Sequence, residues 1–225
     1  MALLAALAGG PALAADSAMA ERTQACTACH GPQGRAGPDG YYPRLAGKPA
    51  GYLYNQLRNF KDGRRHYTLM EGLLAPLSDD YLREMAAYFS SLTPPYPRPL
   101  PSAANPAELA RGRTLALRGD AALQLPACVQ CHGEKLTGVL PATPGLLGLP
   151  RDYLNAQLGG WQTGQRHAQA PDCMAAIARR LTPQDVNAVA LWLAAQPVPN
   201  PANAADSRQP RTTGQLPLPL CGSAP

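Results

Sequence analysis

Apolar and polar residues alternate along much of this chain with the period of an α-helix. Residues 79–89 (DDYLREMAAYF) and 183–193 (PQDVNAVALWL) carry apolar side chains three and four positions apart, which is the spacing of one helix face. Ser78 and Thr182 stand directly before these segments, where a hydroxyl group caps the first turn of a helix. Strand-like alternation is nearly absent. The pattern therefore predicts an all-α protein.

Further helices are predicted at residues 51–62 and 151–163. Each is followed by a glycine, Gly63 or Gly164, that suits the C-terminal turn of a helix. The segment that opens at residue 105 reads Asn-Pro-Ala-Glu, which offers an N-cap, a proline at the first helical position and a capping-box acid. We expect this last helix to run towards residue 120.

The chain contains the same landmarks twice in the same order. Cys26-Thr-Ala-Cys-His-Gly returns as Cys128-Val-Gln-Cys-His-Gly, 102 positions later. The later landmarks are, in order, Pro-x-Leu-x-Gly, then Tyr-Leu-x-x-Gln-Leu, then an aromatic residue followed by Gly and Arg-His, then a methionine, and then a Leu-Ser/Thr pair. They lie at residues 43–47, 52–57, 60–66, 70 and 77–78, and again at 144–148, 153–158, 161–167, 174 and 181–182. The sequence therefore predicts a duplicated domain.

The duplication divides the chain into a first domain at residues 15–93 and a second at residues 105–196. Residues 94–104 between them form a Pro-rich linker, which we expect to be a stiff, extended spacer. Residues 197–225 are a Pro-rich C-terminal tail that we expect to run over the surface. Residues 1–14 are apolar and end in Ala-Leu-Ala, which matches a secretory signal peptide, although no Lys or Arg precedes the apolar run.

A cleaved signal peptide predicts export to the periplasm. The rival interpretation is a membrane anchor, but a span needs ~20 apolar residues, and Asp16 ends the run. No other stretch could cross a bilayer, so we expect no transmembrane segment in the mature chain. The net charge of +5 arises from 20 basic and 15 acidic residues that are spread evenly, without a basic run for nucleic acid.

The sequence Cys-x-x-Cys-His is the attachment motif of c-type haem. Two thiols add to the vinyl groups as thioethers, and the following histidine is placed to bind iron from one face. A zinc site could use two Cys-x-x-Cys pairs without the histidines, and a thioredoxin-like pair expects a βαβ setting that is missing. We therefore predict two covalently attached haem c groups, held by Cys26, Cys29, Cys128 and Cys131, with His30 and His132 as iron ligands.

The order of these landmarks, from Cys-x-x-Cys-His-Gly to the terminal amphipathic helix, resembles class I cytochromes c. The tandem arrangement resembles the dihaem cytochrome c4 family over residues 16–196. This resemblance implies two tandem cytochrome c-like domains, each of three to four short helices around a covalently bound haem. It also implies methionine as the second iron ligand and a role in one-electron transfer rather than catalysis.

Met70 and Met174 are the aligned candidates for the second iron ligand, each eight residues before Ser78 or Thr182. Thioether ligation raises the reduction potential relative to a second histidine. Two alternatives stay open. The methionines could fill gaps in the core, as we expect for Met85. The aligned His66 and His167 could instead supply bis-histidine ligation, although their positions suit the surface or the neighbourhood of the haem propionates.

Pro43 and Pro144 follow the motif histidines by 13 and 12 residues. In the resembled family, a proline at this place offers its carbonyl oxygen to the Nδ1–H of the histidine, and this hydrogen bond orients the ring. The alternative is that each proline only makes a turn.

Cys173 and Cys221 remain outside the repeated motifs. One interpretation is a disulfide that attaches the tail to the second domain, as an oxidising periplasm permits. The other is that Cys173, directly before Met174, ligates the second haem as a thiolate, which would make the chain a dihaem enzyme with a His/Cys haem.

The first functional hypothesis is an electron shuttle between a membrane quinol-oxidising complex and a terminal oxidase of a respiratory chain. The second is the cytochrome subunit of a periplasmic dehydrogenase, with the tail as a docking element. The third is a dihaem enzyme, such as a peroxidase or thiosulfate dehydrogenase, which requires an open or displaceable iron ligand.

Overall fold

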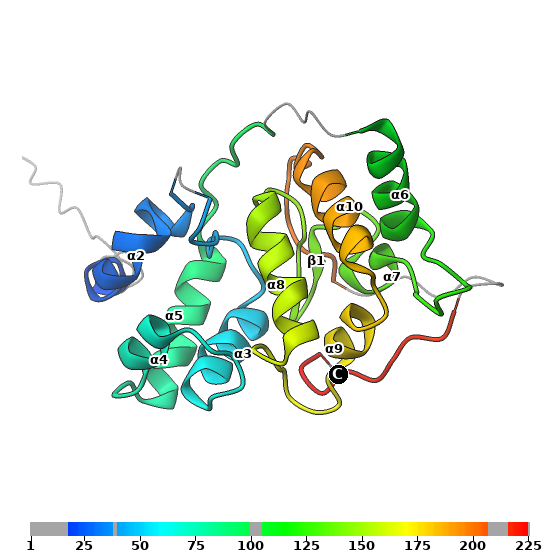
Figure 1. The fold of residues 1–225 in the computed structure, drawn as a ribbon. Coiled ribbons are helices and arrows are strands. Elements are labelled where there is room, and N and C mark those ends of the chain that lie inside the picture. The colour runs from blue at the N-terminus through cyan, green and yellow to red at the C-terminus, as the bar shows by residue number, and fades with distance from the viewer. Residues whose placement is uncertain (1–17, 38–39, 100–104, 207–215, 225) are drawn as a thin grey trace, which may run out of the picture.

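The computed structural model describes residues 18–37, 40–99, 105–206 and 216–224, which fold into two helical halves (Figure 1). The predicted signal peptide at residues 1–14 lies outside the described residues, as do residues 100–104 of the predicted linker. Among the described residues, no helix has the length and apolar character needed to cross a bilayer.

The two halves contain the same succession of helices. The first half has α2 (Gln24–His30), the short 3-10 helix η1 (Pro32–Gly34), α3 (Ala50–Lys61), α4 (Thr68–Leu74) and α5 (Asp79–Ser91). The second has α6 (Pro106–Leu117), α7 (Cys128–His132), α8 (Arg151–Thr163), α9 (Cys173–Ala178) and α10 (Pro183–Ala194). Residues 18–22 are also helical and precede α2.

The predicted helix boundaries agree closely with the structure. The hydroxyl of Ser78 accepts a hydrogen bond from Tyr81 N at the start of α5, and Thr182 caps α10 in a reciprocal capping box with Asp185. Helix α8 has the predicted bounds and ends at Gly164, whose φ of 79° is left-handed. These local signals were sufficient because capping and glycine conformation depend on adjacent residues.

One helix start differs from the prediction. The carboxylate of Glu108 does not complete a capping box in α6, since only the side chain of Asn105 accepts from the backbone, at Ala107 N. Glu108 instead accepts a hydrogen bond from Asn187 Nδ2 of α10 at 3.3 Å. The contact between α6 and α10 therefore replaces the local one. At Gly112 these helices approach so closely that a Cβ atom would lie 2.0 Å from the carbonyl oxygen of Ala188.

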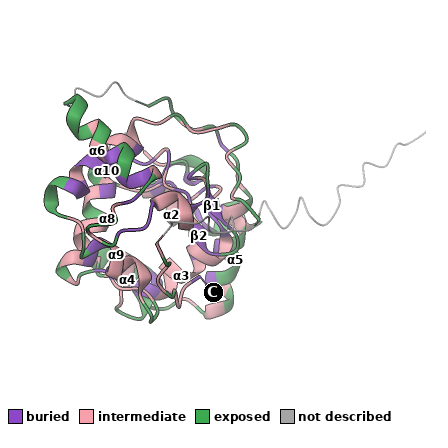
Figure 2. Ribbon diagram, turned by 90° about the vertical axis from the view of Figure 1, so that its right-hand side faces the viewer, coloured by how far each residue is buried: buried purple, intermediate pink, exposed green. Residues whose placement is uncertain are grey.

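Each half has its own apolar core. Phe60, Leu74, Leu82 and Met85 pack together in the first half, and Met85 is a core residue as predicted. The second half has a larger cluster made by residues of α6, α8 and α10 and of the loops between them. Figure 2 shows buried positions where α6 and α10 meet.

A two-stranded antiparallel sheet, β1 (Gly138–Val139) and β2 (Thr143–Pro144), interrupts the helices of the second half. Sequence periodicity could not predict it, because two-residue strands contain no repeating pattern. The sheet does not change the fold class. Its consequence for the site is that β2 holds Pro144 in place.

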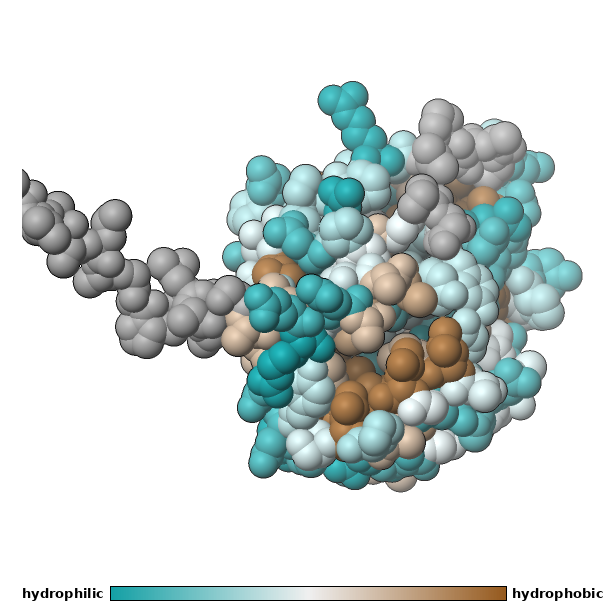
Figure 3. Space-filling model, turned by 90° about the vertical axis from the view of Figure 1, so that its left-hand side faces the viewer, coloured by the Kyte–Doolittle hydropathy of each residue, from teal (hydrophilic) through white to brown (hydrophobic). Residues whose placement is uncertain are grey.

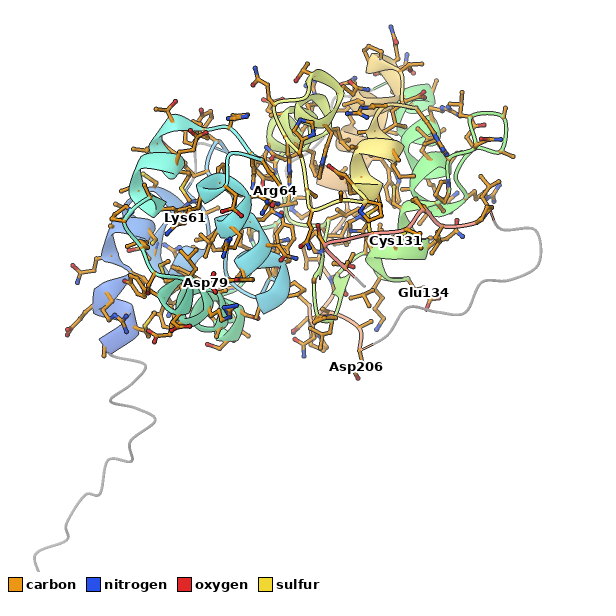
Figure 4. All side chains as sticks on the ribbon, turned by 90° about the horizontal axis from the view of Figure 1, so that it is seen from below. Lys61, Arg64, Asp79, Cys131, Glu134 and Asp206 are labelled. Atoms are coloured by element: carbon orange, nitrogen blue, oxygen red, sulfur yellow. A yellow bond between two sulfur atoms is a disulfide. The ribbon has the colours of Figure 1, made fainter. Side chains whose placement is uncertain are left out.

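Equivalent loops of the two copies pair with each other where the halves meet. The segment after α3 and the segment after α8 form an antiparallel bridge between Arg65 and Arg166. His66 N donates to Gln165 O at 3.0 Å, and His167 N donates to Arg64 O at 2.5 Å. Arg64 lies at this junction in Figure 4. The contact is reciprocal, as in an interface with two-fold symmetry.

Residues 94–99 of the predicted linker are held against both halves. The buried guanidinium of Arg44 donates to the carbonyl oxygens of Pro94 and Pro95. It also stacks 3.8 Å from the ring centre of Tyr96. On its other side, the ring of Tyr96 lies against Gly148 of the second half. A Cβ atom added at Gly148 would lie 2.4 Å from the Tyr96 ring. This part of the linker therefore packs as a structural element between the halves.

Candidate functional site

The two Cys-x-x-Cys-His motifs form short helices, α2 and α7. Residues three apart share one side of a helix, so the helical turn places the two thiols of each motif on the same side. None of these four cysteines is in a disulfide. Burial raises the pKa of Cys128 to about 12 and also raises the pKa of Cys26. Redox-active pairs have lowered pKa values, so the structure does not support a thioredoxin-like pair.

The motif histidines are buried and oriented by the predicted prolines. His30 Nδ1 donates to the carbonyl oxygen of Pro43 at 2.8 Å, and His132 Nδ1 donates to that of Pro144 at 2.7 Å. Burial lowers the pKa of His30, which favours the neutral ring. A histidine that donates from Nδ1 has Nε2 as its metal-binding nitrogen.

Both candidate methionines lie in short helices beside the cores. Met70 in α4 packs against the first-half cluster that contains Phe60 and Leu74, and Met174 in α9 packs against Trp161, Ala175 and Ala178. Their thioether groups belong to half-buried residues. The predicted ligands therefore come from equivalent helices in the two copies.

A single large cavity joins these groups. Its volume is about 2270 Å³, and its lining includes both motif histidines, both methionines and the four motif cysteines. Pockets for one small ligand have about 300–1,000 Å³, so the space can hold more than one large group. Apolar side chains from both cores supply much of the wall, among them Leu53, Phe89, Leu154 and Leu193.

The rival histidines do not occupy equivalent places. The side chain of His66 is 56% exposed, and its Nδ1 lies 3.4 Å from the carboxylate of Glu71 at the cavity rim. His167 is half-buried and is not part of the cavity lining. This difference favours the methionines, which line the cavity in both copies.

Two arginines, the buried Arg166 and the half-buried Arg65, lie where the cavity crosses between the halves. Arg65 donates to Gln56 and Gln157 at 3.0 and 2.5 Å, and Arg166 donates to the same two amide oxygens at 2.9 and 2.7 Å. Among the described residues, neither arginine has a carboxylate partner within ion-pair distance. Buried charges are normally paired, so this arrangement suits acid groups of a bound molecule.

Sequence reasoning did not identify this cluster, although its members were visible as repeated landmarks. Lys48 adds a further cation, because it is only 4% exposed and donates to Gly145 O of the other half at 2.9 Å. Burial is the main reason that the pKa of Lys48 falls to about 8, and the nearby Arg44 adds to the effect.

The indole of Trp161 offers another donor to the cavity. Its Nε1 atom is buried and has no hydrogen-bond partner within the chain. A buried donor without an acceptor costs about 1–3 kcal/mol. The equivalent residue of the first copy is Phe60, which has no such donor. The two copies therefore offer different polar groups to whatever fills the cavity.

The structure joins Cys173 and Cys221 in a disulfide with a Cα–Cα distance of 4.9 Å. This agrees with the interpretation that the tail is attached to the second half. In this form Cys173 has no thiolate for iron. Among the described residues, no group of three or more His, Cys, Asp or Glu side chains is placed to hold a metal ion.

Comparison with known proteins gives the family. A family model described as Cytochrome c matches residues 14–93. The chain is 35% identical over 188 residues to cytochrome c4 of Pseudomonas aeruginosa, covering 82% of this chain and 90% of that protein. The chain belongs to the cytochrome c4 family. It is also 42% identical over 184 residues to the thiosulfate dehydrogenase electron acceptor of Thiomonas intermedia, covering 81% of this chain and 83% of that protein.

Solved structures support the predicted fold of two tandem cytochrome c-like domains. Reduced cytochrome c4 from Pseudomonas stutzeri matches with a TM-score of 0.69 at 31% identity, covering 80% of this chain and 97% of that chain. A thiosulfate dehydrogenase from Marichromatium purpuratum matches with a TM-score of 0.72 at 34% identity, covering 82% of this chain. The present chain spans 40% of the length of that dehydrogenase.

Membership in this family implies covalently bound haem c, and the site fits that group. The motif thiols, the two motif histidines and the methionines line one largely apolar cavity, and each histidine is oriented by a proline carbonyl. The arginines between the halves and the Trp161 N–H offer partners for acid groups. Haem c carries such groups as its two propionates.

Proposed function

We propose that this cytochrome c4 homologue is a periplasmic dihaem electron carrier. The observation that supports it best is the paired geometry of the cavity, with the histidine of each copy oriented by a proline carbonyl. In this proposal, the thioether bonds come from Cys26, Cys29, Cys128 and Cys131, and the iron ligands are His30 with Met70 and His132 with Met174.

The haem groups supply the one-electron chemistry, and the chain makes that chemistry fast and reversible. Two fixed protein ligands leave no coordination position for a substrate, so little has to reorganise when the charge changes. The proline carbonyls keep each imidazole in one orientation. The apolar wall would keep water away from the haems, and the buried Lys48 and Arg166 would offset the charge of the propionates.

The proposed electron donor is a periplasmic dehydrogenase, in place of the quinol-oxidising complex of the first hypothesis. Relatives from Thiomonas intermedia and Stutzerimonas stutzeri, 42% and 38% identical, are named as thiosulfate dehydrogenase electron acceptors. Their names support a thiosulfate-oxidising enzyme as the donor and a carrier rather than an enzyme for this chain. A terminal oxidase of the respiratory chain is the proposed acceptor.

Mixing experiments test this function. The oxidised holoprotein is expected to become reduced, as followed by its haem absorption, when thiosulfate and catalytic amounts of a purified thiosulfate dehydrogenase are both present. Thiosulfate alone is expected to leave it oxidised. Reduction by thiosulfate without the enzyme would contradict the assignment as a carrier, and no reduction in the complete mixture would contradict the proposed donor.

The hydrophobic surface beside the first haem site is the proposed contact for the donor. Leu69 and Leu73 of α4 flank Met70 and are 47% and 46% exposed, and Tyr41 nearby at the cavity edge is 61% exposed. Figure 3 shows an apolar patch beside a hollow on the side of the molecule that includes α2 and α4. Contiguous exposed apolar residues often mark protein interaction sites.

Replacing Leu69 and Leu73 together by glutamine is expected to slow reduction by the dehydrogenase several-fold without changing either reduction potential. Exposed positions tolerate such changes within about 0.5 kcal/mol of stability. Stopped-flow mixing measures the rate. Leu140→Gln is the matched control, because Leu140 is 46% exposed but does not line the cavity. Equal slowing by the control would contradict a contact at α4.

Trp161→Phe gives the second copy the residue that the first copy has in this place. We expect the potential of the second haem to fall by tens of millivolts, because 1 kcal/mol corresponds to about 40 mV in a one-electron couple. Loss of the N–H leaves more negative charge on the propionate and stabilises ferric iron. Arg166, 3.9 Å from the indole centre, keeps an aromatic partner. An unchanged second potential would show that Trp161 has another partner.

A further inference from the structure

The last described residues of the chain are attached to both halves. Cys221 forms the disulfide with Cys173, and Gly222 N donates to Pro171 O at 2.9 Å. On the other side, Asn55 Nδ2 of α3 donates to Ser223 O at 2.8 Å. We call residues 216–224 the C-terminal clasp. It connects the segment before Met174 to the first half.

The C-terminal clasp is packed tightly and forms part of the cavity wall. A Cβ atom at Gly222 would lie 2.2 Å from the carbonyl oxygen of Ala170, so the backbones touch. Ala224 is 9% exposed although it stands one residue from the end of the chain. Pro219, Cys221, Ser223 and Ala224 line the cavity together with Met174.

Helix α9, which contains Met174, packs against α8 through Ala175 and Ala178, and Gln162 Nε2 of α8 donates to Ala178 O at 2.9 Å near its end. It contains six residues, and helices of this length are not stable without tertiary support. Asp172 caps it, with Oδ1 accepting from Ala175 N at 3.0 Å and Oδ2 accepting from Ala168 N at 2.7 Å. The disulfide at its first residue is the one covalent attachment of α9 to a distant segment among the described residues.

The first copy does without this attachment. In the alignment of Met70 with Met174, the residue that corresponds to Cys173 is Leu69, whose side chain is exposed. Helix α4 is held at its start by Glu71, whose Oε1 accepts from Tyr67 N at 2.9 Å. The C-terminal clasp is therefore attached to the methionine helix of the second site only.

We infer that the C-terminal clasp is a positioning element for Met174, and that reduction of the Cys173–Cys221 disulfide loosens the iron–sulfur bond of the second haem only. This inference rests on the proposed ligation. The reductant is a dithiol. It gives two electrons and two protons to the disulfide, its own sulfur atoms join in a disulfide, and Cys173 and Cys221 become thiols. Release of Cys221 frees the clasp from α9.

The test uses full-length ferrous holoprotein, because a dithiol cannot change iron that is already reduced. Proton NMR reports each iron-bound methionine as a separate strongly shifted methyl signal, and the signal lost in Met174→Ala identifies the second haem. Dithiol treatment and the double variant Cys173→Ala/Cys221→Ala are both expected to weaken that signal. They should also raise carbon monoxide binding at the second haem several-fold and leave the Met70 signal unchanged.

Leu220→Ala is the matched control, since Leu220 is 80% exposed and the disulfide remains. If the double variant fails to fold, dithiol treatment of the folded protein decides the question. Two unchanged methionine signals after treatment would overturn the inference. A wild-type protein with fewer than two such signals would instead contradict the proposed ligation, so the two failures are distinguishable.

Discussion

Replacing Cys128 and Cys131 together by alanine is expected to give a chain with one covalently bound haem instead of two. Without the thioether bonds the proposed second haem would be held only by its two iron ligands and by packing contacts, and it could be lost from the core of the second half. Leaving so large an apolar-lined space unfilled destabilises a fold by about 24 cal/mol per Å³ of cavity. We therefore expect loss of helical signal from this half as well as loss of the haem.

Intact mass and haem content per chain measure the first effect, and circular dichroism measures the second. The double variant Cys173→Ala/Cys221→Ala is the control, because it removes two cysteines of the same half outside the attachment motif. It should retain both haems. A Cys128/Cys131 variant that still binds two haems covalently would contradict the assigned attachment sites.

Met70→His and Met174→His, made separately, are expected to lower the potential of the altered haem by on the order of 100 mV or more, since imidazole stabilises ferric iron relative to a thioether. The potential of the unaltered haem should change by much less than that of the altered one. A potentiometric titration of each variant measures both values.

Met85→Leu is the matched control for the methionine variants. Met85 is 3% exposed and belongs to the same core cluster as Met70, but it lies in α5 and its removal takes no ligand from iron. We expect unchanged potentials. A drop in Met85→Leu equal to that in Met70→His would show that core packing rather than ligation determines the potential.

Much of the fold could be predicted from the sequence because its signals are local. The hydroxyl caps at Ser78 and Thr182 and the glycine after α8 act on neighbouring backbone, so they fix helix ends wherever the helix is packed. The duplication then gave the architecture, since a landmark in one copy predicts its equivalent in the other. The positions of Pro43 and Pro144 followed from the family resemblance rather than from any periodicity.

The contacts between the copies could not be predicted in the same way. Gln56 and Arg166 come from different halves, 110 positions apart, and meet only after both halves have folded. Their residue types indicate no partner, because an arginine and a glutamine are usually solvent-exposed. The role of Lys48 was missed for the same reason, since its acceptor is a backbone carbonyl of the other half.

The two sites are related but not equivalent, and the differences are specific. The second has the Trp161 N–H where the first has Phe60, and it alone includes the disulfide beside its methionine. The first has the exposed leucines of α4. We expect electrons to enter at the first haem and to leave from the second, whose potential a hydrogen bond from the Trp161 N–H to a propionate would raise.

A potentiometric titration of the purified holoprotein, followed by absorption spectroscopy, tests the central claim most directly. The account predicts two one-electron steps per chain at different potentials. It also predicts, in the oxidised protein, the weak far-red band of an iron–methionine sulfur bond at an intensity that corresponds to two haems. A single step from one haem, or two low-potential steps without that band, would contradict a dihaem carrier with His/Met ligation at both sites.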